Sequence, residues 1–189
     1  MLNFDWEKGF CLEECNAAPG SPGVTFRYLS QMNNMYVDKT TCENILITED
    51  PLIYSFQELG APDCSGDLSF SVSTVYPGKI GKEYYMTKGH FHNILNTAEV
   101  YYGLSGKGMI LMENDKDDAK AFPLSPGQVV YVPKGYAHRS INTGKIPFSF
   151  FFVFRADAGH DYGTIEQTGF RKLILEENDR PVYVDNPKK

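Results

Sequence analysis

The residues with the clearest chemical potential are three histidines and one glutamate in the middle of the chain. His90 and His92 stand two positions apart in a strand-like run, so their imidazoles share one face of that strand. Glu99 follows after a loop, and His138 comes shortly after a Pro-Lys-Gly turn. Three imidazoles and one carboxylate suit iron, manganese, nickel, cobalt or zinc, and leave positions open for a substrate. The set favours one divalent metal ion, with ordinary surface or core histidines as the alternative.

These side chains need a β-rich framework to bring them together. Short apolar runs separated by turn residues follow one another at roughly 8–12-residue spacing from position 67 onward. The expected strands are 52–56, 68–76, 84–92, 98–104, 109–113, 128–132, 137–142, 148–154, 170–175 and 182–184, and a short helix is expected over 38–47. This pattern predicts an all-β sandwich or barrel, and the spacing alone leaves immunoglobulin-like, lipocalin-like and jelly-roll arrangements open.

The composition is that of an acidic, β-rich domain. A length of 189 residues favours a single domain over residues 1–189, and 13 Phe with 12 Tyr favour strands. The net charge of −6 argues against nucleic-acid and anionic-membrane partners, because both need a positive surface. No signal peptide and no apolar run of about 18 residues is visible. We therefore expect a cytoplasmic protein.

The four cysteines give no second metal signature. Cys11 and Cys15 are close, but a Cys-x-x-x-Cys pair without a second pair nearby is a poor zinc motif. Cys42 and Cys64 stand apart in the sequence. Reduced thiols are the expectation for all four in a cytoplasmic protein.

A second motif surrounds His138. The order glycine, five residues, proline, one residue, glycine, two residues, histidine, three residues, asparagine is met by Gly127, Pro133, Gly135, His138 and Asn142. The sequence resembles the cupin superfamily in this motif and in the earlier one, which comprises His90, His92, Glu99 and Gly106. The resemblance implies a jelly-roll β-barrel or sandwich with a few short helices. Six residues separate His92 from Glu99, where the usual cupin has three or four.

This longer loop points to one cupin branch. The runs 76–83, 85–92, 98–101 and 156–163 resemble the cupin-type phosphoglucose isomerases, and the likeness covers about residues 25–187. It implies metal-dependent interconversion of glucose 6-phosphate and fructose 6-phosphate, with iron(II) favoured over manganese, nickel and zinc. It also implies a homodimer, core motifs over about 67–155, and an N-terminal extension over about 1–60 that packs on the barrel.

The resemblance further implies roles for individual residues. Glu99 is implied as the catalytic, proton-moving carboxylate as well as a metal ligand, and in a hydride shift it would chiefly position metal and sugar. The positions implied in substrate binding are Ser73, Thr87, Gly89, Tyr101, His160 and Tyr162. Phe154 stands where many family members carry tyrosine, which removes a hydroxyl donor. Isomerisation of another sugar phosphate such as mannose 6-phosphate, a cupin dioxygenase activity, and non-catalytic sugar-phosphate binding stay open as alternatives.

Overall fold

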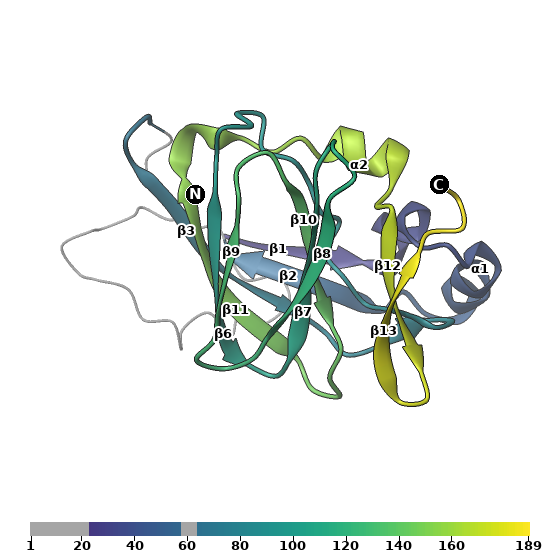
Figure 1. Cartoon of the computed structure of the whole chain (residues 1–189). Helices are drawn as coiled ribbons and strands as arrows, with labels where there is room; N and C mark the ends of the chain where they lie inside the picture. The colour runs from purple at the N-terminus through teal and green to yellow at the C-terminus, as the bar shows by residue number, and fades with distance from the viewer. Residues whose placement is uncertain (1–22, 58–63) are drawn as a thin grey trace.

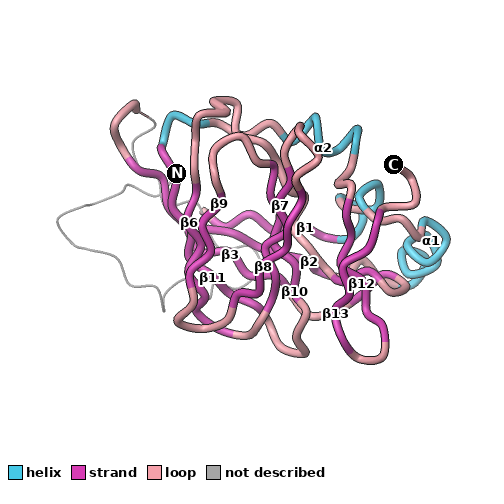
Figure 2. The backbone as a smooth tube through the Cα atoms, in the orientation of Figure 1, coloured by secondary structure: helices cyan, strands magenta, loops and turns pink. Residues whose placement is uncertain are grey.

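The computed structural model describes residues 23–57 and 64–189, which form a β-rich molecule with two short α-helices (Figures 1 and 2). The strands are β1 (Val24–Tyr28), β2 (Leu52–Gln57), β3 (Leu68–Val75), β4 (Lys79–Ile80), β5 (Glu83–Tyr84), β6 (Glu99–Ser105), β7 (Gly108–Glu113), β8 (Ala119–Leu124), β9 (Val129–Val132), β10 (Ala137–Asn142), β11 (Phe148–Arg155), β12 (Lys172–Glu177) and β13 (Arg180–Asp185). The helices are α1 (Lys39–Thr48), α2 (Tyr162–Thr168) and the short 3-10 turns Leu29–Gln31, Asn33–Met35 and Ala156–Ala158. The predicted all-β class is confirmed.

The strands pair into three antiparallel sheets. The largest has six strands in the order β1-β2-β3-β11-β6-β9, the second is β10-β7-β8, and the third is β13-β12-β5-β4. The β12–β13 hairpin lies on the same side of the molecule as α1, away from β3, β6 and β9 (Figure 1). The architecture is the cupin jelly roll that the motifs imply. Strands β1 and β2, which fall within the predicted N-terminal extension, are members of the six-stranded sheet. The single domain and the extension themselves stay a prediction.

Alternation along the strands decides which side chains enter the interior. Successive residues of a strand point to opposite faces of the sheet. In β11, Phe148, Phe150 and Phe154 are buried, and in the adjacent β6 Tyr101 is 5% exposed whereas Tyr102 is 40% exposed. The inner face of the six-stranded sheet is therefore aromatic where β6 and β11 pair.

Both α-helices begin at an aspartate. The carboxylate of Asp38 accepts from the Thr41 N–H at 3.0 Å, which fixes the start of α1 and confirms the predicted helix at 38–47. Asp161 caps α2 in the same way through the Thr164 N–H at 3.1 Å. Helix α2 was not predicted, and neither were β1, β4 and β8. Neither α-helix of the described residues has the length and apolar character that a membrane crossing needs.

The strand predicted over 84–92 is wrong. Strand β5 ends at Tyr84, and the following segment pairs with the backbone of β10 at isolated bridges, Met86–Ile141 and His90–His138, rather than as a continuous ladder. Gly89, with φ +76°, interrupts regular strand geometry between these bridges. Residues 85–92 therefore form an irregular segment along the edge of β10, which we call the edge segment.

The described cysteines form no disulfide. Cys42 is a buried free thiol and Cys64 an exposed one. The prediction for Cys11 and Cys15 lies outside the described residues.

Candidate active site

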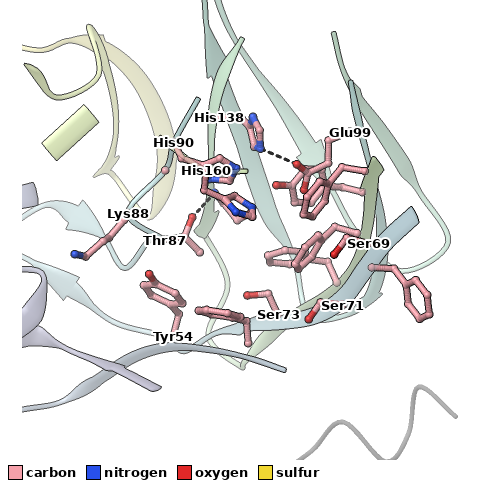
Figure 3. A pocket seen from close by; sticks show the side chains of 18 of the residues that line it. Tyr54, Ser69, Ser71, Ser73, Thr87, Lys88, His90, Glu99, His138 and His160 are labelled. Carbon is pink, nitrogen blue, oxygen red and sulfur yellow. Dashed lines mark hydrogen bonds and ion pairs between the residues drawn. The ribbon is translucent and has the colours of Figure 1, made fainter. Parts of the chain in front are cut away.

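The four predicted metal-binding residues converge on one point of the interior. One potential ligand atom from each of His90, His92, Glu99 and His138 lies within 4.8 Å of every other. The two first histidines come from the edge segment, Glu99 from the start of β6, and His138 from β10. Figure 3 shows His90, His138 and Glu99 directed toward the same space.

Backbone carbonyl groups orient two of the imidazoles. Nδ1 of His92 lies 3.2 Å from the carbonyl oxygen of Gly159, and Nδ1 of His138 lies 3.2 Å from that of Tyr136. We assign the proton of each neutral ring to Nδ1, because that nitrogen faces an acceptor. The lone pair of Nε2 then points inward. This is the arrangement by which carbonyl groups commonly orient metal-ligating histidines.

The inward-facing atoms fit a divalent cation. Nε2 of His92 lies 3.1 Å and Nε2 of His138 lies 3.0 Å from Oε2 of Glu99. With both rings neutral in these tautomers, lone pairs face an anionic oxygen and repel it, so a cation must lie between them; without an ion, a proton on Nε2 takes its place. Nε2 of His90 is buried and has no hydrogen-bonding partner in the described residues. A metal ion would satisfy all four groups at once.

Electrostatics favour the protonation states that metal ligands need. Burial favours the protonated form of Glu99, but the neighbouring His138 and His92 outweigh it, so the pKa of Glu99 lies well below its ordinary value. Burial lowers the pKa of His90 well below its ordinary value, and His138 adds to that effect. At neutral pH Glu99 is therefore charged and His90 is neutral.

A cavity of about 510 Å³ opens beside this cluster. One wall is the inner face of the six-stranded sheet and the other is formed by β10 and the edge segment. Apart from Gln57 and Phe70, the strand residues that line it alternate along each strand: Tyr54 and Phe56; Ser69, Ser71 and Ser73; Glu99 and Tyr101; His138 and Ser140; Phe150, Phe152 and Phe154. The cavity size is in the range of small-molecule sites.

All six residues implied in substrate binding line this cavity: Ser73, Thr87, Gly89, Tyr101, His160 and Tyr162. The hydroxyl oxygen of Thr87 accepts from the Ser140 N–H at 3.0 Å, and the Ser73 hydroxyl donates to the Ser55 carbonyl at 3.0 Å. The Thr87 hydroxyl can therefore donate its own proton to another acceptor, such as a ligand.

Two aromatic residues after β11 close the cavity near the histidines. The rings of His160 and Tyr162 stack with centroids 5.6 Å apart, and His160 lies 4.4 Å from the ring of His90. Tyr101 faces the same space from β6, with its ring 5.8 Å from that of His138. Burial and the Glu99 carboxylate raise the pKa of Tyr101 well above its ordinary value, so it keeps its phenolic proton.

The structure adds cavity residues that the sequence did not reveal. Arg27 of β1 and Tyr54 of β2 pair across the sheet and line the end of the cavity away from the metal cluster. Lys88 also lines the cavity; its ammonium group lies 2.5 Å from the Glu166 carboxylate of α2 and is directed away from Thr87 and His160 (Figure 3). Arg27 carried no signal in the sequence, because only the pairing of β1 with β2 brings it to the site.

The regular spacing of the serines on β3 was a signal available in the sequence. Ser69, Ser71 and Ser73 alternate with apolar residues in one strand, so they form a polar row on a single face. Such a row is typical of a strand that borders a hydrated cavity.

Comparison with known proteins agrees with the geometry. The family model described as Glucose-6-phosphate isomerase (GPI) matches residues 27–187. The glucose-6-phosphate isomerase of Pyrococcus abyssi is 44% identical over 170 residues, covering 90% of this chain and 89% of that protein. That of Pyrococcus furiosus is 46% identical over 162 residues, covering 86% of each chain. A solved structure of Bacillus subtilis oxalate decarboxylase is 28% identical, with a TM-score of 0.44, over 55% of this chain and 26% of that one. The chain belongs to the glucose-6-phosphate isomerase family.

Proposed function

We propose that the protein interconverts glucose 6-phosphate and fructose 6-phosphate with one divalent metal ion held by His90, His92, Glu99 and His138. The observation that carries this proposal is the convergence of these four residues beside a cavity of about 510 Å³. Relatives named glucose-6-phosphate isomerase, matched over most of the chain, supply the substrate and reaction.

The reaction moves hydrogen between C1 and C2 of the sugar. A divalent ion bound at the cluster would supply Lewis-acid stabilisation of negative charge that develops on the sugar oxygens. Glu99 is proposed as the group that takes the proton from one carbon and returns it to the other; its low pKa keeps it in the ionised form that this role needs. In the alternative hydride shift, Glu99 would only position the reacting groups.

The phosphate is proposed to lie at the end of the cavity away from Glu99. Arg27 and Lys88 supply positive charge there, and Thr87 supplies a hydroxyl. Gly89 lets the backbone approach the ligand closely. The stacked rings of His160 and Tyr162 cover the sugar between the two ends and limit access of water.

Iron(II) is the proposed metal, with manganese, nickel and zinc as alternatives that the same ligand set accommodates. Protein stripped by a chelator and reloaded with each metal should regain turnover of fructose 6-phosphate, followed by coupled oxidation of glucose 6-phosphate. Glu99→Gln and His138→Ala should be inactive with every metal, whereas Glu177→Gln, on strand β12, should match the unaltered protein.

The assay also separates the alternatives. Incorporation of solvent deuterium at C2 or C1 would indicate proton transfer, and retention of the substrate hydrogen would indicate a hydride shift. Turnover of mannose 6-phosphate alone would assign a different isomerase, and oxygen consumption would assign a dioxygenase. A folded, metal-loaded protein that binds sugar phosphates without turnover would support the non-catalytic alternative and overturn the proposed function.

We also propose a cytoplasmic homodimer without nucleic-acid or membrane partners, for which the net charge of −6 is supporting evidence. The outward face of β6 and β9 offers an apolar surface for the second subunit, because Tyr102, Val129 and Tyr131 are 40%, 61% and 60% exposed. Sedimentation should give twice the chain mass, and Tyr131→Lys should shift it toward the monomer. A monomer for the unaltered protein contradicts the dimer.

A further inference from the structure

Arg139 is a buried cation directly behind the candidate active site. It follows His138 on β10 and points to the opposite face of that strand, away from the cavity. The side chain is 3% exposed. Buried arginines of this kind are costly unless their donors are satisfied, so its contacts indicate what it does.

The guanidinium contacts the edge segment at two residues. One terminal nitrogen donates to the Lys88 carbonyl at 2.6 Å, and the other lies 2.9 Å from the sulfur of Met86. The plane of the group rests on the ring of Phe170, 4.2 Å from its centroid. Arg139 thus contacts the residues on both sides of Thr87, through the backbone of Lys88 and the side chain of Met86.

The edge segment depends on this support because it has no regular strand pairing. Its backbone hydrogen bonds to β10 occur near Thr87 and at His90. Lys88 and Gly89, which lie between these bonds, have no such bond to β10. A Cβ added at Gly89 would lie 2.7 Å from the Phe170 ring and 3.0 Å from Cβ of Arg139. The segment is therefore packed tightly against the two side chains that lie behind it.

The buried carboxylate of Glu83 favours the charged form of Arg139. Glu83, on β5, is 4% exposed, and its Oε2 accepts from the Val37 N–H at 3.0 Å. Burial lowers the pKa of Arg139 to about 10, and Glu83 is the strongest influence in the opposite direction. The guanidinium therefore stays charged at neutral pH.

We propose that Arg139 is a positioning residue, whose guanidinium fixes the Lys88 carbonyl and thereby the backbone that presents Thr87 and His90 to the cavity. The inference rests on the proposed function in taking His90 as a metal ligand and Thr87 as a substrate contact. It goes beyond that function by assigning a role to a residue that does not line the cavity.

Arg139→Met removes the donors and keeps much of the apolar volume. The matched control is Arg171→Met, because Arg171 also bonds a backbone carbonyl, that of Asn114, and pairs with Asp117 away from the cavity. Titration of chelator-treated protein with cobalt(II), followed by visible absorption, should show about 10- to 100-fold weaker binding for Arg139→Met. Arg171→Met should bind cobalt as the unaltered protein does, even where its melting temperature is lower. Equal cobalt affinity in all three proteins overturns the proposal.

Hydrogen exchange in the metal-free protein provides a second readout, which also serves if Arg139→Met does not fold. Arg139→Lys keeps the charge opposite Glu83 but lacks the two-pronged geometry that contacts Met86 and Lys88 together. The His90 amide, which donates to the His138 carbonyl at 3.2 Å, should exchange about tenfold faster in Arg139→Lys. Unchanged exchange there refutes the positioning role and leaves the isomerase proposal standing. Cobalt binding without isomerisation in the unaltered protein refutes only the isomerase proposal.

Discussion

Nε2 of His138 lies 3.0 Å from Oε2 of Glu99, and each side chain is only about 1% exposed. Water cannot compensate either group if its partner is removed, so the pair must be satisfied by protein atoms or by a bound cation. The same carboxylate oxygen also faces His92 at 3.1 Å. We therefore expect substitutions in this cluster to weaken metal binding more than they disturb the surrounding sheets.

His138→Ala should abolish stoichiometric metal binding, because it removes one of four ligands from a site that no other histidine completes. His160→Ala is the matched control, since the His160 ring lies 4.4 Å from that of His90 yet His160 is not part of the ligand set. Elemental analysis after dialysis should find one metal per chain in His160→Ala and almost none in His138→Ala. Equal metal content in both variants would contradict the assigned ligands.

Acidification should destabilise the metal-free protein. Burial keeps the pKa of His90 below its ordinary value, so between that pKa and about 6.5 the unfolded chain binds a proton that the folded protein does not. The stability is complete above about pH 6.5 and decreases as the pH falls toward the folded-state pKa. The depressed pKa of Glu99 acts with the same sign at lower pH.

Melting temperatures measured at intervals between about pH 7 and pH 5 test this linkage. His90→Asn should show a smaller decrease than the unaltered protein. In the metal-loaded protein, acid should release the metal, because ligating imidazoles must be neutral. Full activity below about pH 4.5 would contradict imidazole ligation.

Gly89→Ala should cost more stability than Gly135→Ala. Both glycines have left-handed φ angles, +76° and +79°, so alanine strains each backbone by about 1–2 kcal/mol. Only at Gly89 does the new Cβ meet Phe170, at 2.7 Å, whereas nothing lies within 4 Å at Gly135. Overpacking should add about 1–3 kcal/mol at Gly89, measured as the difference in free energy of unfolding in urea. An equal loss of unfolding free energy in both variants would show that Phe170 and its neighbours can shift to accommodate the added methyl group.

Phe154→Tyr should strengthen substrate binding. The Phe154 ring lines the cavity 5.1 Å from that of His160, and a hydroxyl there would add a donor at the reacting end. One added hydrogen bond contributes about 0.5–1.5 kcal/mol, so KM for fructose 6-phosphate should fall about 2- to 10-fold. Phe152→Tyr, two residues earlier on the same face, is the control and should change KM less. A higher KM in Phe154→Tyr would show that Phe154 serves to exclude polar groups.

Glu166→Gln should lower KM for the phosphorylated substrate. The Glu166 carboxylate pairs with Lys88 at 2.5 Å, and both groups are partly exposed, at 41% and 23%. Loss of the negative charge frees Lys88 for an anionic ligand, an effect of about 0.2–1 kcal/mol that salt should screen. KM measured at low and high ionic strength tests this, with Glu177→Gln as the control. A KM that rises instead would mean that Glu166 holds Lys88 in its binding position.

The motifs predicted which residues converge in the candidate site, because they reflect backbone geometry as well as ligand types. The two-residue spacing of His90 and His92, and the turn before His138, are features of short stretches of sequence and can be recognised without the structure. The structure brings these residues and Glu99 together, and all six residues implied in substrate binding line one cavity. Strands with clear alternation, such as β6 and β11, were also predicted within one or two residues.

The misses have physical reasons. The edge segment was predicted as a strand partly on the alternation of His90, Phe91 and His92, but the left-handed φ of Gly89 breaks the pairing. Strand β8 contains Pro123, which removes a ladder donor and hid the strand. Arg27 reaches the cavity only through the long-range pairing of β1 with β2, and no local pattern encodes such a contact.

Glu99 belongs to the six-stranded sheet, and His138 belongs to the three-stranded sheet. A divalent ion bound by both would add a tether between two layers that packing, connecting chain and the hydrogen bond from Asn142 Nδ2 to the Val75 carbonyl at 2.8 Å already join. Such a tether makes resistance to unfolding depend on the free metal concentration, by about 2.7 kcal/mol at 100 times the dissociation constant. Metal scarcity in a cell would then lower the amount of this protein through its turnover as well as its catalytic rate, since the untethered chain opens more often to proteases.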